Sequence, residues 1–272
     1  MIVVGAEDQE ENMKTVQKEL LIIIPAYNEE ENISAVLDQL EQMKIVEIAD
    51  ILVMDDASLD NTRQVVQDRG HTVVTHIFHL GYGSGLQLGY KYAVKKGYRY
   101  VIQMDADGQH DVCNVARLYE KLRTPDSEGH YPDIVLGSRF LEESAPFPVS
   151  VVKKFAFLLF RTMIRIGTGR RIIDPTTGLQ GLSRRAFQYY GMYSRFDDRY
   201  PDANMILQML LLGFRVEEIP AVMHARTEGV SMHSGLNPMF YMFRMVFSMM
   251  AVWLRVRLYK VDVGVTNDKK TT

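Results

Sequence analysis

The chain has 272 residues, of which 47% are hydrophobic and 24% charged, values that are ordinary for a globular protein with one large domain. Residues 1–149 contain 13 Lys/Arg and 25 Asp/Glu, whereas residues 150–261 contain 16 and 7. An acidic front half therefore precedes a basic rear half that suits an anionic partner. Because the sequence has no zinc-finger spacing, RNP-like aromatic motif or basic tail, nucleic acid is not expected as that partner.

The first residues and the cysteine content indicate where the protein works. Residues 1–18 are polar and acid-rich and contain no basic segment before a long apolar run, which predicts a loose leader rather than a signal peptide. A single cysteine, Cys113, excludes an internal disulfide. Both features favour a reducing, cytoplasmic compartment.

Patterns typical of buried strands alternate with helical patterns through the front half. The predicted strands are Leu20–Ile24, Ile48–Met54, Thr72–Phe78 and Tyr100–Met104. The predicted helices follow Glu29, follow Asp60 or Asn61, and span Leu86–Lys96. Strands that alternate with helices favour an α/β fold with a parallel, helix-covered sheet.

Polar residues gather at the point where each predicted strand ends. In open parallel sheets, the carboxyl ends of the strands form the edge that binds ligands. The residues expected to line one crevice there are Tyr27, Glu29, Asp56, Gly83, Asp105 and Asp107.

The sequence Asp105-Ala106-Asp107 directly follows the fourth predicted strand. Strand alternation would send both carboxylates to the same side. Two neighbouring carboxylates repel each other and favour a cation between them. Oxygen ligands of this kind suit Mg²⁺ or Mn²⁺ with phosphate oxygens completing the shell. The alternative for this motif alone is a solvated acidic turn after a buried strand.

A glycine-rich segment, Gly81–Gly85, follows the third predicted strand. It has no GxGxxG spacing toward an acidic ribose partner and no Walker lysine, so it matches neither the Rossmann nor the P-loop motif. Two interpretations stay open. The segment either binds phosphate or allows close packing of a helix on a strand.

Short motifs lie in a fixed order along the chain. They are Pro25–Glu29, Asp55–Ser58, Gly81–Gly89, Asp105–His110, Gly137–Arg139, Asp174–Gly178 and Arg226–Ser231. In this order they resemble family 2 glycosyltransferases of GT-A fold, and more narrowly the dolichyl- or polyprenyl-phosphate sugar synthases, over about residues 20–235. The resemblance implies a Rossmann-like, mostly parallel sheet covered by helices, a nucleotide-sugar donor and inversion of the anomeric centre.

The resemblance also implies roles for individual residues. Those expected to bind the nucleotide-sugar are Pro25, Tyr27, Glu29, Met54, Asp56 (on the base), Gly83, Asp105, Ala106, Asp107, Arg139 and Arg226. The expected metal ligands are Asp105, Asp107 and Gln109, and the expected catalytic groups are Asp107 and Arg226. A guanidinium group matches phosphate oxygens bidentately, which agrees with the roles of the two arginines. The alternative for either arginine is a surface ion pair.

Three positions depart from the resembled pattern. His79 stands where the family often has asparagine, and Leu179-Gln180 stands where it often has arginine after a glycine. Met232, followed by His233, replaces a lysine of the late motif. The last change removes a cation from the expected phosphate site and leaves the acceptor open.

Two segments of the basic half read as amphipathic helices. In Val149–Gly167, one face is predicted to contain Val152, Phe155, Ala156, Leu159, Met163 and Ile166. In Leu236–Tyr259, one face contains Met239, Phe240, Phe243, Phe247, Met250 and Leu254, and Arg244, Ser248, Ala251 and Arg255 share the opposite stripe. Basic amphipathic helices with aromatics suit a membrane interface. Arg244 interrupts the second segment, so it is expected to lie on the membrane or on a partner rather than cross. The alternative is packing in the core.

The predicted organisation is a leader (1–18), a GT-A catalytic domain (19–235), an amphipathic C-terminal helix (236–260) and a polar tail (261–272).

The predicted reaction moves a sugar from a UDP- or GDP-linked donor to a polyprenyl phosphate or glycolipid at the inner membrane face. A small membrane protein or a second copy of the chain is a further candidate partner. One rival is transfer to a hydroxyl of a polysaccharide or glycolipid, for which Asp202 would be the base. Another is an inactive binding module that recruits a membrane partner.

Overall fold

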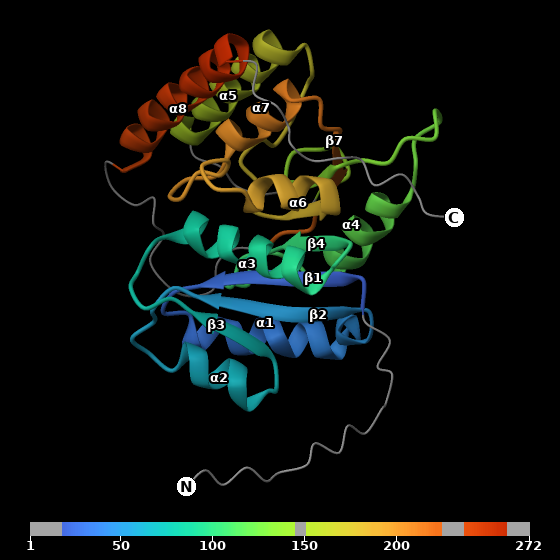
Figure 1. Ribbon diagram of the computed structural model, residues 1–272, viewed down its shortest axis with the longest axis vertical. Helices are drawn as coiled ribbons and strands as arrows, with labels where there is room; N and C mark the ends of the chain where they lie inside the picture. Colours follow the sequence, from blue (N-terminus) through green and yellow to red (C-terminus); the bar gives the residue numbers. More distant parts are fainter. Residues whose placement is uncertain (1–17, 145–150, 225–236, 260–272) are drawn as a thin grey trace, which may run out of the picture.

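The structure, a computed structural model, describes residues 18–144, 151–224 and 237–259. These residues build a sheet of seven strands: β1 (Leu20–Ala26), β2 (Ala49–Asp55), β3 (Thr72–Thr75), β4 (Tyr100–Gln103), β5 (Ile134–Ser138), β6 (Gln180–Ser183) and β7 (Val216–Pro220). The strand order is β3-β2-β1-β4-β6-β5-β7 (Figure 1). Strand β6 runs antiparallel to both neighbours, and every other pair is parallel. The predicted mostly parallel sheet is confirmed.

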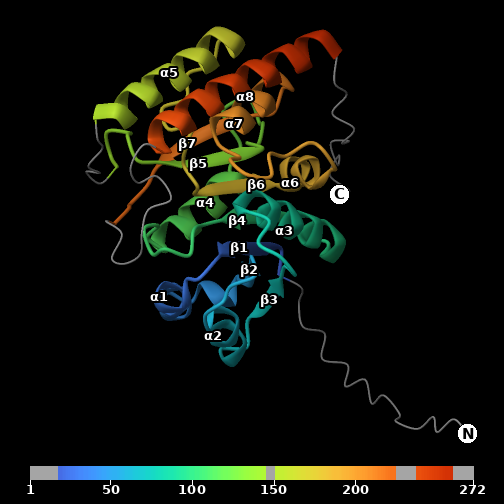
Figure 2. The same ribbon diagram turned by 90° about the vertical axis from the view of Figure 1, so that its left-hand side faces the viewer.

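Helices cover both faces of this sheet. They are α1 (Glu30–Gln42), α2 (Thr62–Asp68), α3 (Tyr82–Lys96), α4 (Cys113–Arg123), α5 (Val151–Thr168), α6 (Arg184–Gly191), α7 (Ala203–Leu211) and α8 (Asn237–Tyr259), with a short 3₁₀ turn at Ile45–Glu47. Helices α1, α2 and α4 pack on one face, and α3 and α6 pack on the other. Helices α5, α7 and α8 form a further layer beyond α6, far from α1 and α2 (Figure 2).

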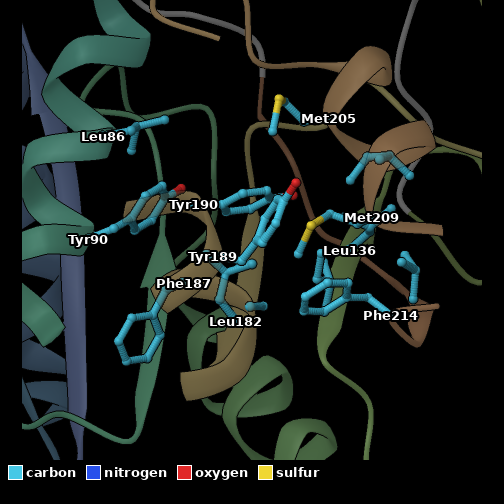
Figure 3. Packing of buried hydrophobic residues seen from close by; sticks show 14 of the residues in the cluster. Leu86, Tyr90, Leu136, Leu182, Phe187, Tyr189, Tyr190, Met205, Met209 and Phe214 are labelled. Carbon is cyan, nitrogen blue, oxygen red and sulfur yellow. The ribbon is translucent and has the colours of Figure 1, made fainter. Parts of the chain in front are cut away.

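Large aromatic side chains join this outer layer to the sheet. Tyr90 of α3 and Tyr190 of α6 are fully buried, with ring centroids 5.6 Å apart. Figure 3 shows these rings beside Met205 and Met209 of α7. Each buried aromatic removes a large apolar area from water and so contributes strongly to stability. The packing fixes the positions of α3 and α7, whose first residues both reach the site described below.

Element boundaries differ from the sequence prediction around residue 80. Strand β3 ends at Thr75 rather than at Phe78, and α3 begins at Tyr82 rather than at Leu86. Ile77 and Phe78 are exposed, because the chain turns away from the sheet toward Asp56. Gly81 precedes the helix with φ +100°, a conformation that L side chains rarely adopt. Strand β2 also starts one residue later than predicted, at Ala49.

Helix α5 buries only part of the predicted apolar face. Ala156 of that face is buried together with Phe160 and Ile164, whereas Phe155 and Ile166 of the same face are exposed. Helix α5 packs against both α7 and α8, so residues outside the predicted stripe also meet a neighbour. An apolar stripe identifies an amphipathic helix but does not fix which neighbour it meets.

Candidate active site

The carboxyl ends of β1, β2 and β4 lie at one edge, because the three strands are adjacent and parallel. Hydrogen bonds join the loops that follow β1 and β2. The Asn28 amide donates to Ser58 Oγ at 3.0 Å, and the Glu29 amide donates to Thr62 Oγ1 at 2.9 Å. The structure therefore brings Tyr27, Glu29 and Asp56 to the edge where the sequence predicted them.

The carboxylate of Asp56 organises the loop between β3 and α3. Its oxygens accept from the backbone amides of Leu80 and Gly81 at 2.9 and 2.7 Å. The Nδ1 atoms of His76 and His79 lie 2.7 and 3.0 Å from the same carboxylate. Burial alone would raise the pKa of Asp56, but these partners outweigh it and the pKa is lowered. A nucleotide base that bound to the Asp56 carboxylate, as predicted, would therefore compete with four partners from the protein itself.

Tyr27 and His79 lie next to each other beside Asp56. Their ring centroids lie 4.1 Å apart with the ring planes tilted by 37°, and Tyr27 is 40% exposed. An exposed aromatic ring at the end of a parallel strand offers a surface on which a flat base can stack. The sequence flagged His79 only as a departure, and the structure gives it a position beside Tyr27.

Three predicted donor-site residues lie in close-packed surroundings. Met54 is 1% exposed and packs in the core, and Ala106 is 3% exposed. A Cβ on Gly83 would lie 2.1 Å from the carbonyl oxygen of Asp197, so this glycine allows α3 to approach that backbone closely. The predicted donor contacts of Met54 and Ala106 stay predictions. For Gly83, the structure supports close packing, although against a loop rather than a strand.

The acidic residues lie in a turn and not on the strand. Strand β4 ends at Gln103, and residues 105–108 form the turn, with Gly108 at φ +71°. The Asp107 carboxylate accepts from the Gln109 amide at 3.1 Å, which shapes the turn locally. Strand alternation therefore does not set the direction of the two carboxylates, because the strand ends before Asp105, and their shared orientation stays a prediction.

Asp105 is held by groups from distant parts of the chain. The Tyr82 hydroxyl, at the start of α3, donates to Asp105 Oδ1 at 2.9 Å. On the other side, a Cβ on Gly178 would lie 2.6 Å from Asp105 Oδ2, so the backbone passes directly beside the carboxylate. The Asp105 amide donates to His110 Nδ1 at 3.1 Å. Burial raises the pKa of Tyr82, so its hydroxyl remains a donor at neutral pH.

The donor atoms around this turn fit a hard divalent cation. Asp105, Asp107 and Gln109 supply carboxylate and amide oxygens, which Mg²⁺ and Mn²⁺ accept, and the Asp105 side chain keeps 31% exposure. Within residues 18–144, 151–224 and 237–259, no three His, Cys, Asp or Glu side chains form a preformed metal cluster. A cation here would depend on oxygens of a bound diphosphate to complete its shell.

Arg139 is paired within the protein. Its Nε and Nη2 atoms donate to the two oxygens of Asp174 at 2.7 Å each, and Nη2 also donates to Thr176 Oγ1 at 2.9 Å. Asp174 is 0% exposed and Arg139 is 15% exposed. The fork-to-carboxylate pairing uses the face of the guanidinium that would otherwise bind phosphate. The predicted phosphate contact of Arg139 stays a prediction.

Asp202, the N-cap of α7, is more enclosed than a first-turn surface acid. The Tyr241 hydroxyl of α8 donates to its Oδ2 at 2.6 Å. Burial raises the pKa of Asp202 to about 6, with Asp105 adding to the rise and Arg139 opposing it. These electrostatic neighbours place Asp202 on the α7 side of the same site that contains Asp105.

Sequence reasoning missed Tyr82, Tyr241 and His76. Each contacts a carboxylate 20 or more positions away, so no local pattern marks it. The predicted catalytic residue Arg226, with Met232 and His233, lies outside the described residues. The described chain reaches His224, whose amide donates to the Gln109 carbonyl oxygen at 2.8 Å.

A mostly parallel sheet with an acidic turn at its carboxyl edge defines the GT-A class of fold. Among solved structures, the chain is similar to glucosyl-3-phosphoglycerate synthase from Mycobacterium tuberculosis, determined with Mn²⁺, UDP and phosphoglyceric acid. The TM-score is 0.64 at 18% identity, over 92% of this chain and 80% of the other. The predicted fold class is therefore confirmed.

The family follows from the sequence comparison. The family model described as "Glycosyl transferase family 2" matches residues 21–191, so the chain belongs to this family and is a glycosyltransferase. It is 28% identical over 222 residues to an undecaprenyl-phosphate mannosyltransferase of Micrococcus luteus, covering 79% of this chain and 88% of the relative. It is 27% identical over 252 residues to a polyprenol monophosphomannose synthase of Mycolicibacterium smegmatis, covering 88% and 90%. Because the chain is a glycosyltransferase, the alternative that it is an inactive binding module is no longer supported.

Proposed function

We propose that this glycosyltransferase moves a sugar from a UDP- or GDP-linked donor to a polyprenyl phosphate at the cytoplasmic face of a membrane, with inversion and with a divalent metal. The names of its relatives supply the acceptor class. One feature of the structure carries the proposal. The apolar side chains of α8 face outward, while Tyr241 of the same helix donates to the Asp202 carboxylate of the candidate site.

Ser248 and Arg255 of α8 bond to α7, whereas Arg244 and Arg257 are exposed. Ser248 accepts from Asn204 Nδ2 at 2.8 Å, and Arg255 donates to Gln208 Oε1. The outward residues are Phe240, Phe243, Phe247, Met250, Leu254 and Leu258, each at least 45% exposed. A contiguous apolar surface of this kind marks a site that contacts lipid or another protein. It supports a face that lies against a membrane, as interfacial helices do.

Over Met239–Tyr259, helix α8 is also long and apolar enough to cross a membrane. Its packing along α5 and α7 favours the interfacial interpretation instead, because polar residues of α8 are bonded to the domain. Exposed Phe155 and Leu158 extend the apolar surface onto α5. The exposed basic residues Lys154 and Arg165 of α5 suit anionic headgroups.

The residues of the chain divide the work of the proposed reaction. Tyr27 and His79 would stack on the base, and Asp105, Asp107 and Gln109 would bind the diphosphate side of the donor through a cation. When bound, that cation would offset the charge that develops on the departing nucleoside diphosphate. Arg226 would add positive charge toward the phosphates. A phosphate acceptor is already an anion at neutral pH and requires no general base.

The test is direct. The protein is incubated with labelled UDP- and GDP-sugars, Mg²⁺ or Mn²⁺, and vesicles that contain polyprenyl phosphate. Label in an acid-labile, organic-soluble product supports the proposal, and the anomeric configuration of that product tests inversion. Label that stays in water-soluble or polysaccharide products would contradict a polyprenyl-phosphate acceptor.

One observation favours a hydroxyl acceptor as the second candidate. Asp202 has a pKa of about 6 and lies on the α7 side of the site. A carboxylate with such a pKa can accept a proton near neutral pH. The same assay with hydroxyl acceptors and the Asp202→Asn variant distinguishes the candidates, because only a hydroxyl acceptor requires this base.

A further inference from the structure

Two carboxylates of this protein, Asp174 and Asp105, have partners of different kinds. Asp174 is paired with the cation Arg139, so the two charges cancel inside the protein. Asp105 is instead held by a hydroxyl, that of Tyr82. A neutral donor orients a carboxylate without neutralising it, whereas an arginine does both.

The surroundings of Asp105 restrict its orientation from two sides. The Tyr82 hydroxyl donates to Oδ1 at 2.9 Å, and the backbone at Gly178 lies against Oδ2. His110 Nε2 is 3.7 Å from Oδ2, which is too far for a hydrogen bond. The carboxylate is therefore oriented by a hydroxyl donor that carries no charge.

Tyr82 is itself held in place. It is the first residue of α3, and Gly83 and Ser84 fasten this end of the helix to residues 197–198. The Ser84 amide donates to the Asp198 carbonyl oxygen at 3.0 Å. Tyr82 thus connects a rigid helix start to the acidic turn.

We propose that Tyr82 is a positioning residue that fixes the Asp105 carboxylate, with Gly178 on the opposite side, in the orientation that binds the divalent cation of the nucleotide-sugar site. This inference rests on the metal dependence in the proposed function. An unrestrained aspartate side chain loses rotational freedom when a ligand binds, and this loss costs free energy. The hydrogen bond from Tyr82 removes part of that cost in advance.

The chain offers a matched control. The Tyr98 hydroxyl donates to Asp50 Oδ2 at 2.7 Å, in a place remote from the acidic turn, where Lys18 Nζ also lies 3.2 Å from Asp50 Oδ1. Tyr82→Phe and Tyr98→Phe each remove one hydroxyl from one carboxylate. A general effect of losing such a bond appears in both variants, and a positioning effect appears in Tyr82→Phe alone.

The experiment measures free Mn²⁺ by electron paramagnetic resonance in titrations of the full-length protein, with and without UDP or GDP. Tyr82→Phe is expected to raise the Kd of Mn²⁺ about five- to tenfold, and Tyr98→Phe to leave it within about twofold of wild type. Because Tyr82 acts through Asp105, Tyr82→Phe is expected to have no further effect in an Asp105→Asn background.

Gly178→Ala is a second variant that does not change the tyrosine. Its added Cβ would press on Asp105 Oδ2 and should also raise the Kd. Unchanged Mn²⁺ affinity in both Tyr82→Phe and Gly178→Ala would overturn the inference, even if both lower the Tm. Wild-type protein that binds no Mn²⁺ with either nucleotide would remove the metal dependence and this inference together. Wild-type binding with an unaffected Tyr82→Phe would remove this inference alone.

Discussion

Helices α1 and α8 both cover apolar neighbours, yet they turn opposite sides to the outside. Helix α1 buries Ile33, Val36, Leu37 and Leu40 on the sheet and exposes polar residues such as Glu31 and Gln39. Helix α8 buries Met245 and Met249 but leaves a row of phenylalanines exposed.

Under the proposed function, the front and rear halves meet different surroundings. A helix that faces water places its polar residues outward, as α1 does. Helix α8 uses Tyr241, Ser248 and Arg255 to bind α7, which leaves apolar side chains for an apolar environment. The front half would then bind the water-soluble donor, and the rear half would face the membrane.

The largest expected effect tests the donor half. Asp107→Asn removes a charged ligand of the proposed cation, so transfer should fall by about 10²–10³-fold. Steady-state rates across a Mn²⁺ titration measure it. Asp68→Asn, an exposed acid on α2, is the control and should change little. If Asp107→Asn and a chelator both leave the transfer rate unchanged, the result contradicts the proposal that Asp107 binds a cation required for transfer.

The next effect tests the cation assigned to the phosphates. Arg226→Ala should lower transfer by about 10–100-fold, because an uncompensated phosphate charge raises the barrier. Asp202→Asn should retain activity within about threefold if the acceptor is a phosphate. Arg63→Ala, an exposed arginine of α2, controls for loss of positive charge. A collapse of kcat in Asp202→Asn, with donor binding intact, would indicate a hydroxyl acceptor.

A smaller effect tests the outward face of α8. Replacing Phe243 and Phe247 by serine should weaken binding to anionic vesicles about tenfold, while hydrolysis of a soluble donor continues. Flotation at low and high salt measures this, and binding should decline as salt screens the basic residues. Phe78→Ser alters an aromatic that is 72% exposed in the loop after β3, a strand that lies far from α8 (Figure 2), and should not weaken vesicle binding. If both variants lost vesicle binding equally, the outward face of α8 would not be the surface that binds the membrane.

The smallest effect concerns the pH dependence of stability. Asp202 has a folded-state pKa of about 6, above its ordinary value of 3.8. Its contribution to stability is therefore most favourable below about pH 4 and is lost as the pH rises to about 6. The full shift would correspond to about 3 kcal/mol, and partial exposure reduces this to about 1 kcal/mol. Urea unfolding of wild type and Asp202→Asn from pH 4 to 7, with a chelator, should show their difference changing by that amount. A constant difference would show that Asp202 titrates normally.

The sequence by itself determined the strands of the front half and the edge where the site forms. Continuous apolar runs predicted β1, β2 and β4, and the shared direction of parallel strands brought Tyr27, Asp56 and Asp105 to one edge. This information is local, because each run is followed at once by its polar residues.

The tertiary structure alone decided which groups hold the site carboxylates and which way α8 faces. Tyr82 and Asp105 are 23 positions apart, and Tyr241 and Asp202 are 39 apart, so only packing brings them together. Likewise, Asp56 proved to organise a loop because its four partners converge on it in space. The apolar stripe of α8 was visible in the sequence, but a lipid surface and a protein core attract the same residues. The stripe that contains Ser248 and Arg255 was also visible, but only the fold supplies its partners on α7, Asn204 and Gln208.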